Sequence, residues 1–291
     1  MMERVEVAKG VELAVDRWRV RGAPTGLPPM VLVHGLASNA RLWDGVADRL
    51  VARGHEVVTV DLRGHGRSSK PPSGYDVGTV AHDLAALIGR LDLDRPVVAG
   101  QSWGGNVVLE LAATHPDCVG GIACVDGGWL DLQARFPDWE TCRTALAPPR
   151  LAGRPLADVE GYIRAAHPDW PETGIRGTLA NFEIRADGTI APWLTFERHI
   201  DVLRGLWEHR PGELYAAIAA PVLLIPATSG DPAASDDRSR AVAAAEAAIP
   251  RARVHWLTGD HDIHAQHPIE VGDVLHDATT DGFFTREAAR A

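Results

Sequence analysis

The stretch Gly100-Gln101-Ser102-Trp103-Gly104-Gly105 decides how this sequence folds. An apolar run, Pro96-Val97-Val98-Ala99, precedes it and a helical stretch over residues 106–113 follows, so the serine stands where a buried strand turns into a helix. A turn this sharp strains the backbone of the serine, and the glycines let strand and helix approach each other. The pattern G-x-S-x-G therefore predicts a serine hydroxyl that stands clear of a sheet, beside a helix N-terminus.

Short apolar strands alternate with amphipathic helices on both sides of this turn. Such alternation indicates a mostly parallel sheet with helices on both faces. Residues 4–20 alternate charged and apolar around Lys9-Gly10, which predicts an antiparallel hairpin before it. The strands and helices that we expect next are, in chain order, a strand at 30–33, a helix at 41–52, a strand at 57–60, a helix at 76–91, the strand at 96–99 and a strand at 120–125.

The alternation stops after Asp126-Gly127-Gly128 and resumes at Pro221-Val222-Leu223-Leu224-Ile225. The residues between carry helical fragments, prolines and aromatics, but no apolar run typical of a buried strand. We therefore expect a core domain made of residues 1–127 and 216–291, with residues 128–215 inserted as a helical cap domain. The second part of the core is predicted to hold a helix at 236–248, a strand at 253–257 and a last helix at 268–278.

Composition and charge limit the kinds of partner. The chain has 291 residues, of which 45% are hydrophobic and 23% charged, with a formal net charge of −10. This negative balance argues against nucleic acid and anionic membrane surfaces and leaves a small-molecule substrate. No apolar run approaches the ~20 residues that a membrane-spanning helix needs, and no signal peptide is visible. Three cysteines without metal or redox spacing suit the cytoplasm. The expected oligomeric state is a monomer or homodimer.

Four motifs occur in a definite order. His34-Gly35-Leu36 follows the strand at 30–33, Asp61-x-Arg63-Gly64-His65-Gly66-x-Ser68 follows the next strand, Gly100-x-Ser102-x-Gly104 comes third, and His261 comes late. In these motifs the chain resembles the α/β-hydrolase fold family over roughly residues 4–280. The resemblance implies an eight-stranded, mostly parallel sheet flanked by helices. It also implies that Ser102 is the nucleophile, that His261 is its base and that the backbone amides of Leu36 and Trp103 form the oxyanion hole.

The acid of the triad has two candidates. In most of the family the acid follows the strand after the insertion, which gives Asp231 in Ala227-Thr228-Ser229-Gly230-Asp231-Pro232. That loop has alanine where glycine is usual, and one extra residue before the aspartate. Other members, such as haloalkane dehalogenases and zearalenone lactonases, place the acid at the end of the strand after the serine, where Asp126 stands. We favour Asp126 slightly and keep Asp231 as the alternative.

The nucleophile narrows the reaction. Haloalkane dehalogenases and epoxide hydrolases of this fold attack with aspartate, whereas a serine suits acyl transfer to water. The resemblance thus implies hydrolysis of an ester or lactone through an acyl-enzyme, without metal or organic cofactor. His261, His264 and His267 have a spacing that could bind a metal, but no carboxylate is placed to support them. We therefore expect no metal site.

The insertion is expected to shape the substrate. Caps of this family cover the serine, so the aromatic residues of the insertion are candidates to bind a medium-sized, largely apolar substrate. Trp103 beside the serine also resembles proline iminopeptidases, which makes an aminopeptidase the first alternative. A lyase, a haloperoxidase-like enzyme or a slow, receptor-like member of the fold are the others. The substrate-binding candidates are Trp129, Trp139, Trp170, Trp193 and Trp207.

Overall fold

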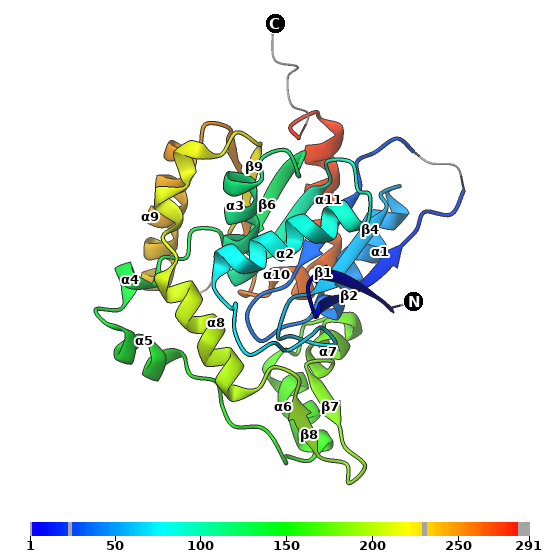
Figure 1. Ribbon diagram of the computed structural model, residues 1–291, viewed down its shortest axis with the longest axis vertical. Helices are drawn as coiled ribbons and strands as arrows, with labels where there is room; N and C mark the ends of the chain where they lie inside the picture. The colour runs from blue at the N-terminus through cyan, green and yellow to red at the C-terminus, as the bar shows by residue number, and fades with distance from the viewer. Residues whose placement is uncertain (1, 23–24, 229–231, 285–291) are drawn as a thin grey trace, which may run out of the picture.

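The computed structural model describes residues 2–22, 25–228 and 232–284, and Figure 1 shows its ribbon. Within these ranges eight strands form one sheet: β1 (Met2–Ala8), β2 (Val11–Trp18), β3 (Met30–Val33), β4 (Val57–Asp61), β5 (Val97–Gln101), β6 (Gly121–Val125), β9 (Val222–Ile225) and β11 (Ala252–Val254). Their order is β1-β2-β4-β3-β5-β6-β9-β11. β1, β2 and β4 pair antiparallel, and all later neighbours pair parallel. The mostly parallel, eight-stranded sheet is thus confirmed.

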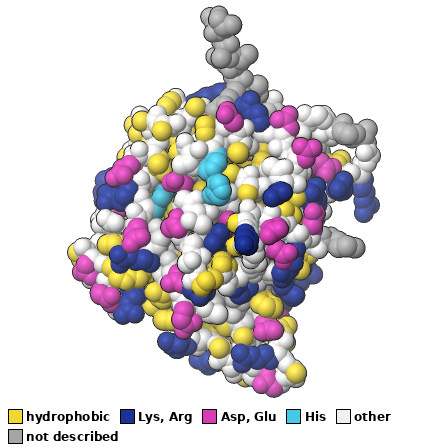
Figure 2. Space-filling model, viewed as in Figure 1, with side chains coloured by type: hydrophobic (Ala, Val, Ile, Leu, Met, Phe, Trp, Pro, Cys, Tyr) yellow, Lys and Arg dark blue, Asp and Glu magenta, His cyan; other side chains and the backbone are white. Residues whose placement is uncertain are grey.

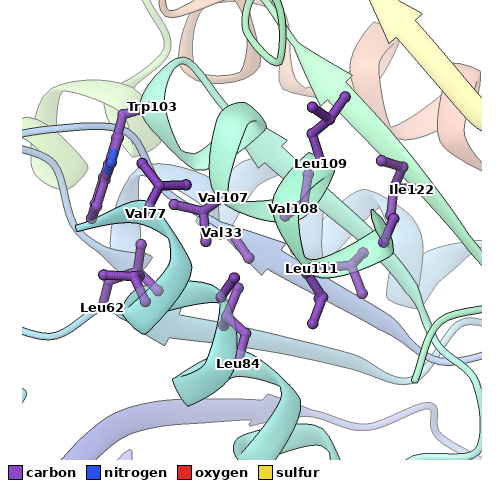
Figure 3. Close-up of a cluster of buried hydrophobic side chains, with 14 of the residues drawn as sticks. Val33, Leu62, Val77, Leu84, Trp103, Val107, Val108, Leu109, Leu111 and Ile122 are labelled. Atoms are coloured by element: carbon purple, nitrogen blue, oxygen red, sulfur yellow. The ribbon is translucent and has the colours of Figure 1, made fainter. Parts of the chain in front are cut away.

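Helices cover both faces of the sheet. Successive residues of a strand point to opposite faces, and β3 shows this directly: Val31 and Val33 join one hydrophobic core, whereas Met30 and Leu32 join the other. The first core also holds α2 (Val77–Arg90), α3 (Trp103–Thr114) and α9 (Pro232–Ala248). The second holds α1 (Asp44–Ala52), α10 (Ile263–Gln266) and α11 (Pro268–Thr280). Figure 3 shows how side chains of α2 and α3 meet the sheet in the first core.

Two predicted elements differ in detail. The helix expected from residue 41 begins with a 3₁₀ turn, η1 (Ala40–Trp43), because the side chain of Asn39 accepts the backbone N–H of Arg41 and tightens the first turn. The strand expected at 253–257 is divided. After β11 the chain leaves the main sheet and forms β12 (Leu257–Thr258), which pairs with β10 (Ala227–Thr228) in a separate two-stranded sheet.

The segment between β6 and β9 lies outside the main sheet and connects two strands that are neighbours in it. Its buried side chains Val159, Ile175 and Ile190 belong to a third hydrophobic cluster, which also includes Leu42 and Ala265 from outside this segment. Figure 1 shows α6, α7, β7 and β8 together at the lower end of the molecule, beyond the sheet. The elements of this segment are α4 (Leu132–Arg135), α5 (Trp139–Leu146), α6 (Leu156–Ala166), α7 (Glu172–Leu179), β7 (Phe182–Ile184), β8 (Ile190–Pro192), α8 (Phe196–Glu208), η2 (Pro211–Glu213) and η3 (Tyr215–Ala217).

Candidate active site

Ser102 lies between the end of β5 and the start of α3, with the left-handed backbone angle φ 53°. Such a conformation costs a non-glycine residue about 1–3 kcal/mol and persists only where the surroundings enforce it. The glycines on either side allow it. A Cβ on Gly100 would overlap the backbone of Gly104, and one on Gly104 would overlap the carbonyl oxygen of His34. The sharp turn predicted from G-x-S-x-G is therefore present.

Three side chains from distant parts of the sequence form one chain of hydrogen bonds. The hydroxyl of Ser102 lies 2.8 Å from Nε2 of His261, and Nδ1 of His261 lies 2.6 Å from Oδ2 of Asp126. Asp126 directly follows β6, the neighbour of β5. The carboxyl ends of parallel neighbours meet at one edge of the sheet, which places this aspartate beside the serine. A carboxylate at Asp126 accepts the Nδ1 proton, so that Nε2 is left to accept from the serine.

His261 stands in the loop between β12 and α10, and its neighbours hold this loop in place. The side-chain amide of Gln101, the residue before the serine, donates to the carbonyl of His261 over 3.1 Å. On the other side, Oε1 of Gln266 accepts the backbone N–H of Asp260 over 2.6 Å. The base is thus fixed through its backbone as well as through its ring. No pattern in the sequence predicts this role of Gln101.

Opposing effects act on the pKa of His261. Burial lowers it, but the hydrogen bond to Asp126 and the negative charges of Asp262 and Asp126 raise it. The positive charge of Arg238 lowers it again, and the net shift is upward from 6.5. A raised pKa makes the imidazole a stronger base, which must still be neutral to accept a proton.

Of the two candidate acids, Asp126 and Asp231, the structure describes only Asp126. The carboxylate of Asp126 is 2% exposed, and its second oxygen, Oδ1, accepts the backbone N–H of Ala227 over 3.1 Å. The backbone of Asp126 also has a positive φ of 40°. Asp231 lies outside the described residues.

The backbone amides of Leu36 and Trp103, near the serine, have no hydrogen-bond acceptor among the described residues. The loop that carries Leu36 packs tightly on the serine, because a Cβ on Gly35 would lie 3.1 Å from Cβ of Ser102. The ring of His34 fixes this loop: Nε2 accepts the N–H of Leu62 over 2.9 Å, and Nδ1 donates to the carbonyl of Gly35 over 2.7 Å. Unused amides at this place are available to a developing oxyanion.

The five tryptophans of the insertion lie in different surroundings. Trp129 is buried in the first core, and Trp170 packs against His167 with its ring centroid 4.0 Å away. Trp139 and Trp207 pack against each other at 6.0 Å. Trp193 lines a cavity of about 430 Å³.

This cavity lies between the loop after Leu36 and the insertion. Ala37 and Ser38 line it on the core side, and the rings of Phe182, Trp193 and Phe196 line it on the other. Its lining does not include Ser102 or His261. The cavity therefore borders the loop beside the serine rather than the serine itself.

The late histidines lie in different surroundings. His264 is fully buried against Trp43, with ring centroids 4.3 Å apart, and neither ring nitrogen has a hydrogen-bond partner among the described residues. Burial lowers the pKa of His264 to about 3. Across the described ranges, no group of three or more histidine, cysteine or acidic side chains could hold a metal ion.

Charges on the surface are mixed. Figure 2 shows basic and acidic side chains interspersed over the face that it presents, without a large region of one sign. In the part of the chain that the structure describes, no helix is long and apolar enough to cross a membrane.

Comparison with known proteins agrees with this fold. A family model described as the alpha/beta hydrolase fold matches residues 28–268. A 2-(acetamidomethylene)succinate hydrolase from Mesorhizobium japonicum is 28% identical over 224 residues, which cover 75% of this chain and 77% of that protein. A non-heme chloroperoxidase from Streptomyces lividans is 38% identical over 112 residues, or 38% of this chain and 39% of the relative.

Solved structures agree as well. The crystal structure of E-2-(acetamidomethylene)succinate hydrolase superposes with a TM-score of 0.76 at 24% identity and covers 97% of this chain and 99% of that one. An esterase of M. tuberculosis superposes with a TM-score of 0.69, also at 24% identity, and covers 96% of this chain and 91% of that one. At such identities the likeness shows the fold.

Proposed function

The chain belongs to the α/β-hydrolase fold family, and from that premise we propose that it is a serine hydrolase that cleaves a carboxylic ester or lactone. The observation that carries the proposal is the unbroken chain of hydrogen bonds from the hydroxyl of Ser102 through His261 to the buried carboxylate of Asp126. A serine linked in this way to a base that is itself oriented by an acid is the arrangement of an activated nucleophile. Relatives named as hydrolases and esterases support the reaction class.

The reaction follows from this geometry. Oγ of Ser102 attacks the acyl carbonyl while its proton passes to Nε2 of His261. The amides of Leu36 and Trp103 stabilise the oxyanion, a contribution that is typically worth about 3–4 kcal/mol per donor. His261 then gives its proton to the leaving alcohol oxygen as the C–O bond breaks. A water molecule that His261 deprotonates hydrolyses the acyl-enzyme, and the returned proton restores the hydroxyl of Ser102.

We propose that residues 128–215 act as a cap and that the cavity beside Trp193 receives part of the substrate. Its rings at Phe182, Trp193 and Phe196 suit an apolar acyl group of medium size. The cavity borders Ala37, which follows the proposed oxyanion donor Leu36. A substrate group in this cavity would therefore lie beside the loop that carries Leu36.

The aminopeptidase alternative has less support. It needs acidic side chains of the cap that are free to bind an amino terminus. Glu140 forms an ion pair with Arg143, and both Glu160 and Glu172 pair with Arg164 on the surface. These three carboxylates are already paired with arginine, whereas Glu197 lines the cavity beside Trp193. A haloperoxidase-like activity is favoured only by the names of relatives that match about a third of the chain.

The test is hydrolysis of p-nitrophenyl esters from acetate to octanoate and of a set of lactones. We expect Ser102→Ala to lower kcat by about 10⁴- to 10⁶-fold. Asp126→Asn should lower it by about 10⁴-fold, because the wrong tautomer of His261 then faces the serine. Asp231→Asn, the matched variant at the other candidate, should retain most of the activity. Thermal unfolding of each variant controls for loss of fold.

Covalent labelling separates a slow enzyme from an inert binder. A fluorophosphonate should add to Ser102 in the wild type and not in Ser102→Ala, as read by mass spectrometry. Wild type that cleaves none of the substrates and takes no label would contradict the proposal, as would a Ser102→Ala variant that is as fast as wild type. Collapse of Asp231→Asn with Asp126→Asn unaffected would transfer the acid role to Asp231.

A further inference from the structure

Arg238, on α9, contacts the acid of the proposed triad. Its Nε lies 3.1 Å from Oδ1 of Asp126, and its NH1 donates to the carbonyl of Ala227 over 2.6 Å. The backbone N–H of Ala227 donates to the same Oδ1 over 3.1 Å. Each of three groups thus contacts the other two: the guanidinium of Arg238, the peptide groups of Ala227 and the carboxylate of Asp126. The side chain of Arg238 is 18% exposed, so water weakens this pair less than a pair on the surface.

These contacts orient the carboxylate of Asp126 relative to the ring of His261. Oδ1 accepts the N–H of Ala227 and forms an ion pair with Arg238, while Oδ2 lies 2.6 Å from Nδ1 of His261, so the two oxygens of the carboxylate are held by different partners. A bond between an ionised donor and an ionised acceptor is stronger and shorter than a neutral one. Among the described residues, loss of Arg238 would leave only the amide of Ala227 in contact with that oxygen.

The arginine also brings a positive charge close to the base. Around His261, the negative charges come from Asp126 after β6 and from Asp262 in its own loop, and α9 supplies the positive charge of Arg238. From α10, the buried His264 stays neutral because burial lowers its pKa to about 3. Asp260 is turned toward the insertion, where it accepts from Nε1 of Trp170 over 3.3 Å. Arg238 is therefore the cation that opposes the two carboxylates.

We propose that Arg238 is a positioning residue: it holds Asp126 toward His261 and keeps the base neutral, and so active, to a lower pH than the two carboxylates alone would allow. The inference rests on the proposed function. It distinguishes this chain from a triad in which the acid has only the histidine and backbone amides as partners. Its consequence is a pH range of activity that extends to the acid side.

The pH dependence of kcat/KM, measured from pH 5 to 9 on p-nitrophenyl butyrate, tests this role. Arg238→Met removes the charge but keeps most of the length, and we expect the acid limb to move up by about 0.5 to 1 pH unit. The plateau should fall roughly 3- to 10-fold as Asp126 loses a fixed partner. Arg238→Lys keeps the charge and should restore the position of the acid limb. Arg240→Met is the matched control, because Arg240 is on the same helix but 73% exposed.

A second readout does not depend on turnover. NMR titration of the His261 ring in Ser102→Ala, with and without Arg238→Met, should show a higher midpoint when the arginine is absent. Arg238→Gln replaces Arg238→Met if the latter does not fold. Equal midpoints, or an equal shift in Arg240→Met, would overturn the role of Arg238. If wild type cleaves no ester, the proposed function fails, and the titration alone still decides whether Arg238 acts on His261.

Discussion

The buried side chain of His65 contacts two segments near Ser102: the loop that carries Ala37 and the start of α3 at Trp103. Its Nδ1 donates to the carbonyl of Arg63 over 3.0 Å, and its Nε2 accepts the backbone N–H of Ala37 over 3.3 Å. Its ring stacks on Trp103, with centroids 5.3 Å apart. Burial lowers the pKa of His65 well below its ordinary range, so Nε2 stays unprotonated and able to accept. The proposed oxyanion donors thus share one support.

We expect His65→Phe to lower kcat about 3- to 10-fold with little change in KM. The phenyl ring keeps the stacking on Trp103 but cannot accept the N–H of Ala37, and one neutral hydrogen bond is worth about 0.5–1.5 kcal/mol. Steady-state kinetics on p-nitrophenyl butyrate measure the effect. His82→Phe, at a surface histidine of α2 that contacts His115, is the control. An unchanged kcat would show that Ala37 needs no partner.

At the scale of residues, the sequence indicated the positions of Ser102 and His261 because local motifs mark them. It left Asp126 and Asp231 open, since both follow apolar strands, and the distance between a carboxylate and the distant His261, 2.6 Å for Asp126, cannot be read from a local motif. Arg238 gave no signal, because an arginine on an alanine-rich helix is typical of a solvated surface. The spacing of the tryptophans along the sequence does not show which of them lines a cavity, because that depends on how the insertion packs.

At the scale of elements, most strands and helices were predictable because apolar runs and helical periodicity mark them. The exact ends of helices and strands were not predictable, because they depend on capping side chains such as Asn39 and on where a strand reaches the edge of the sheet. The small hairpin of β7 and β8 was also not predicted, because only Ile190 among its residues is buried and the two strands carry no buried apolar run. The contact between the helix after the serine and the segment after Asp126 could not be seen either.

That contact makes a testable difference between two helical glycines. A Cβ on Gly105, in α3, would lie 2.6 Å from the backbone nitrogen of Gly128 and 2.8 Å from the carbonyl carbon of Gly127. Backbone cannot move aside cheaply, so Gly105→Ala should lower the free energy of unfolding by about 1–3 kcal/mol. Gly89, in α2, has nothing within 4 Å. Gly89→Ala should raise it by about 0.5–1 kcal/mol through the higher helix propensity of alanine.

Urea unfolding at pH 7.5 measures both variants. The two changes are the same in chemistry and in type of element, so any difference reports the close approach of α3 to the segment after β6. If both variants gain stability equally, α3 does not lie as close to Gly127 and Gly128 as described.

At the scale of the whole molecule, several histidines are buried and have a lowered pKa. Burial lowers the pKa of each, and it lowers that of His199 to about 4 and that of His264 to about 3. In an unfolded chain each would titrate near 6.5. The buried histidines with lowered pKa values are His34, His55, His65, His199 and His264.

The fold should therefore lose stability as the pH falls below about 6.5. Between the unfolded and folded pKa values the unfolded chain binds more protons, so each such histidine costs up to about 1.4 kcal/mol per pH unit as the pH falls. His261 and Asp44 act in the opposite direction, because their folded pKa values are raised, that of Asp44 to about 6. The contribution of one histidine is best isolated by a variant that removes it and leaves the rest.

His264→Phe is that variant. It keeps a ring against Trp43, removes two nitrogens that have no hydrogen-bond partner, and cannot be protonated. Between pH 7.5 and pH 5 the wild type should lose about 2 kcal/mol more of its unfolding free energy than the variant does. Urea unfolding at the two pH values measures this difference, in which the contributions of His261, Asp44 and the other histidines cancel. Equal losses in both proteins would mean that His264 finds a proton acceptor or water when it is charged, and that its neutrality is not what makes the fold sensitive to acid.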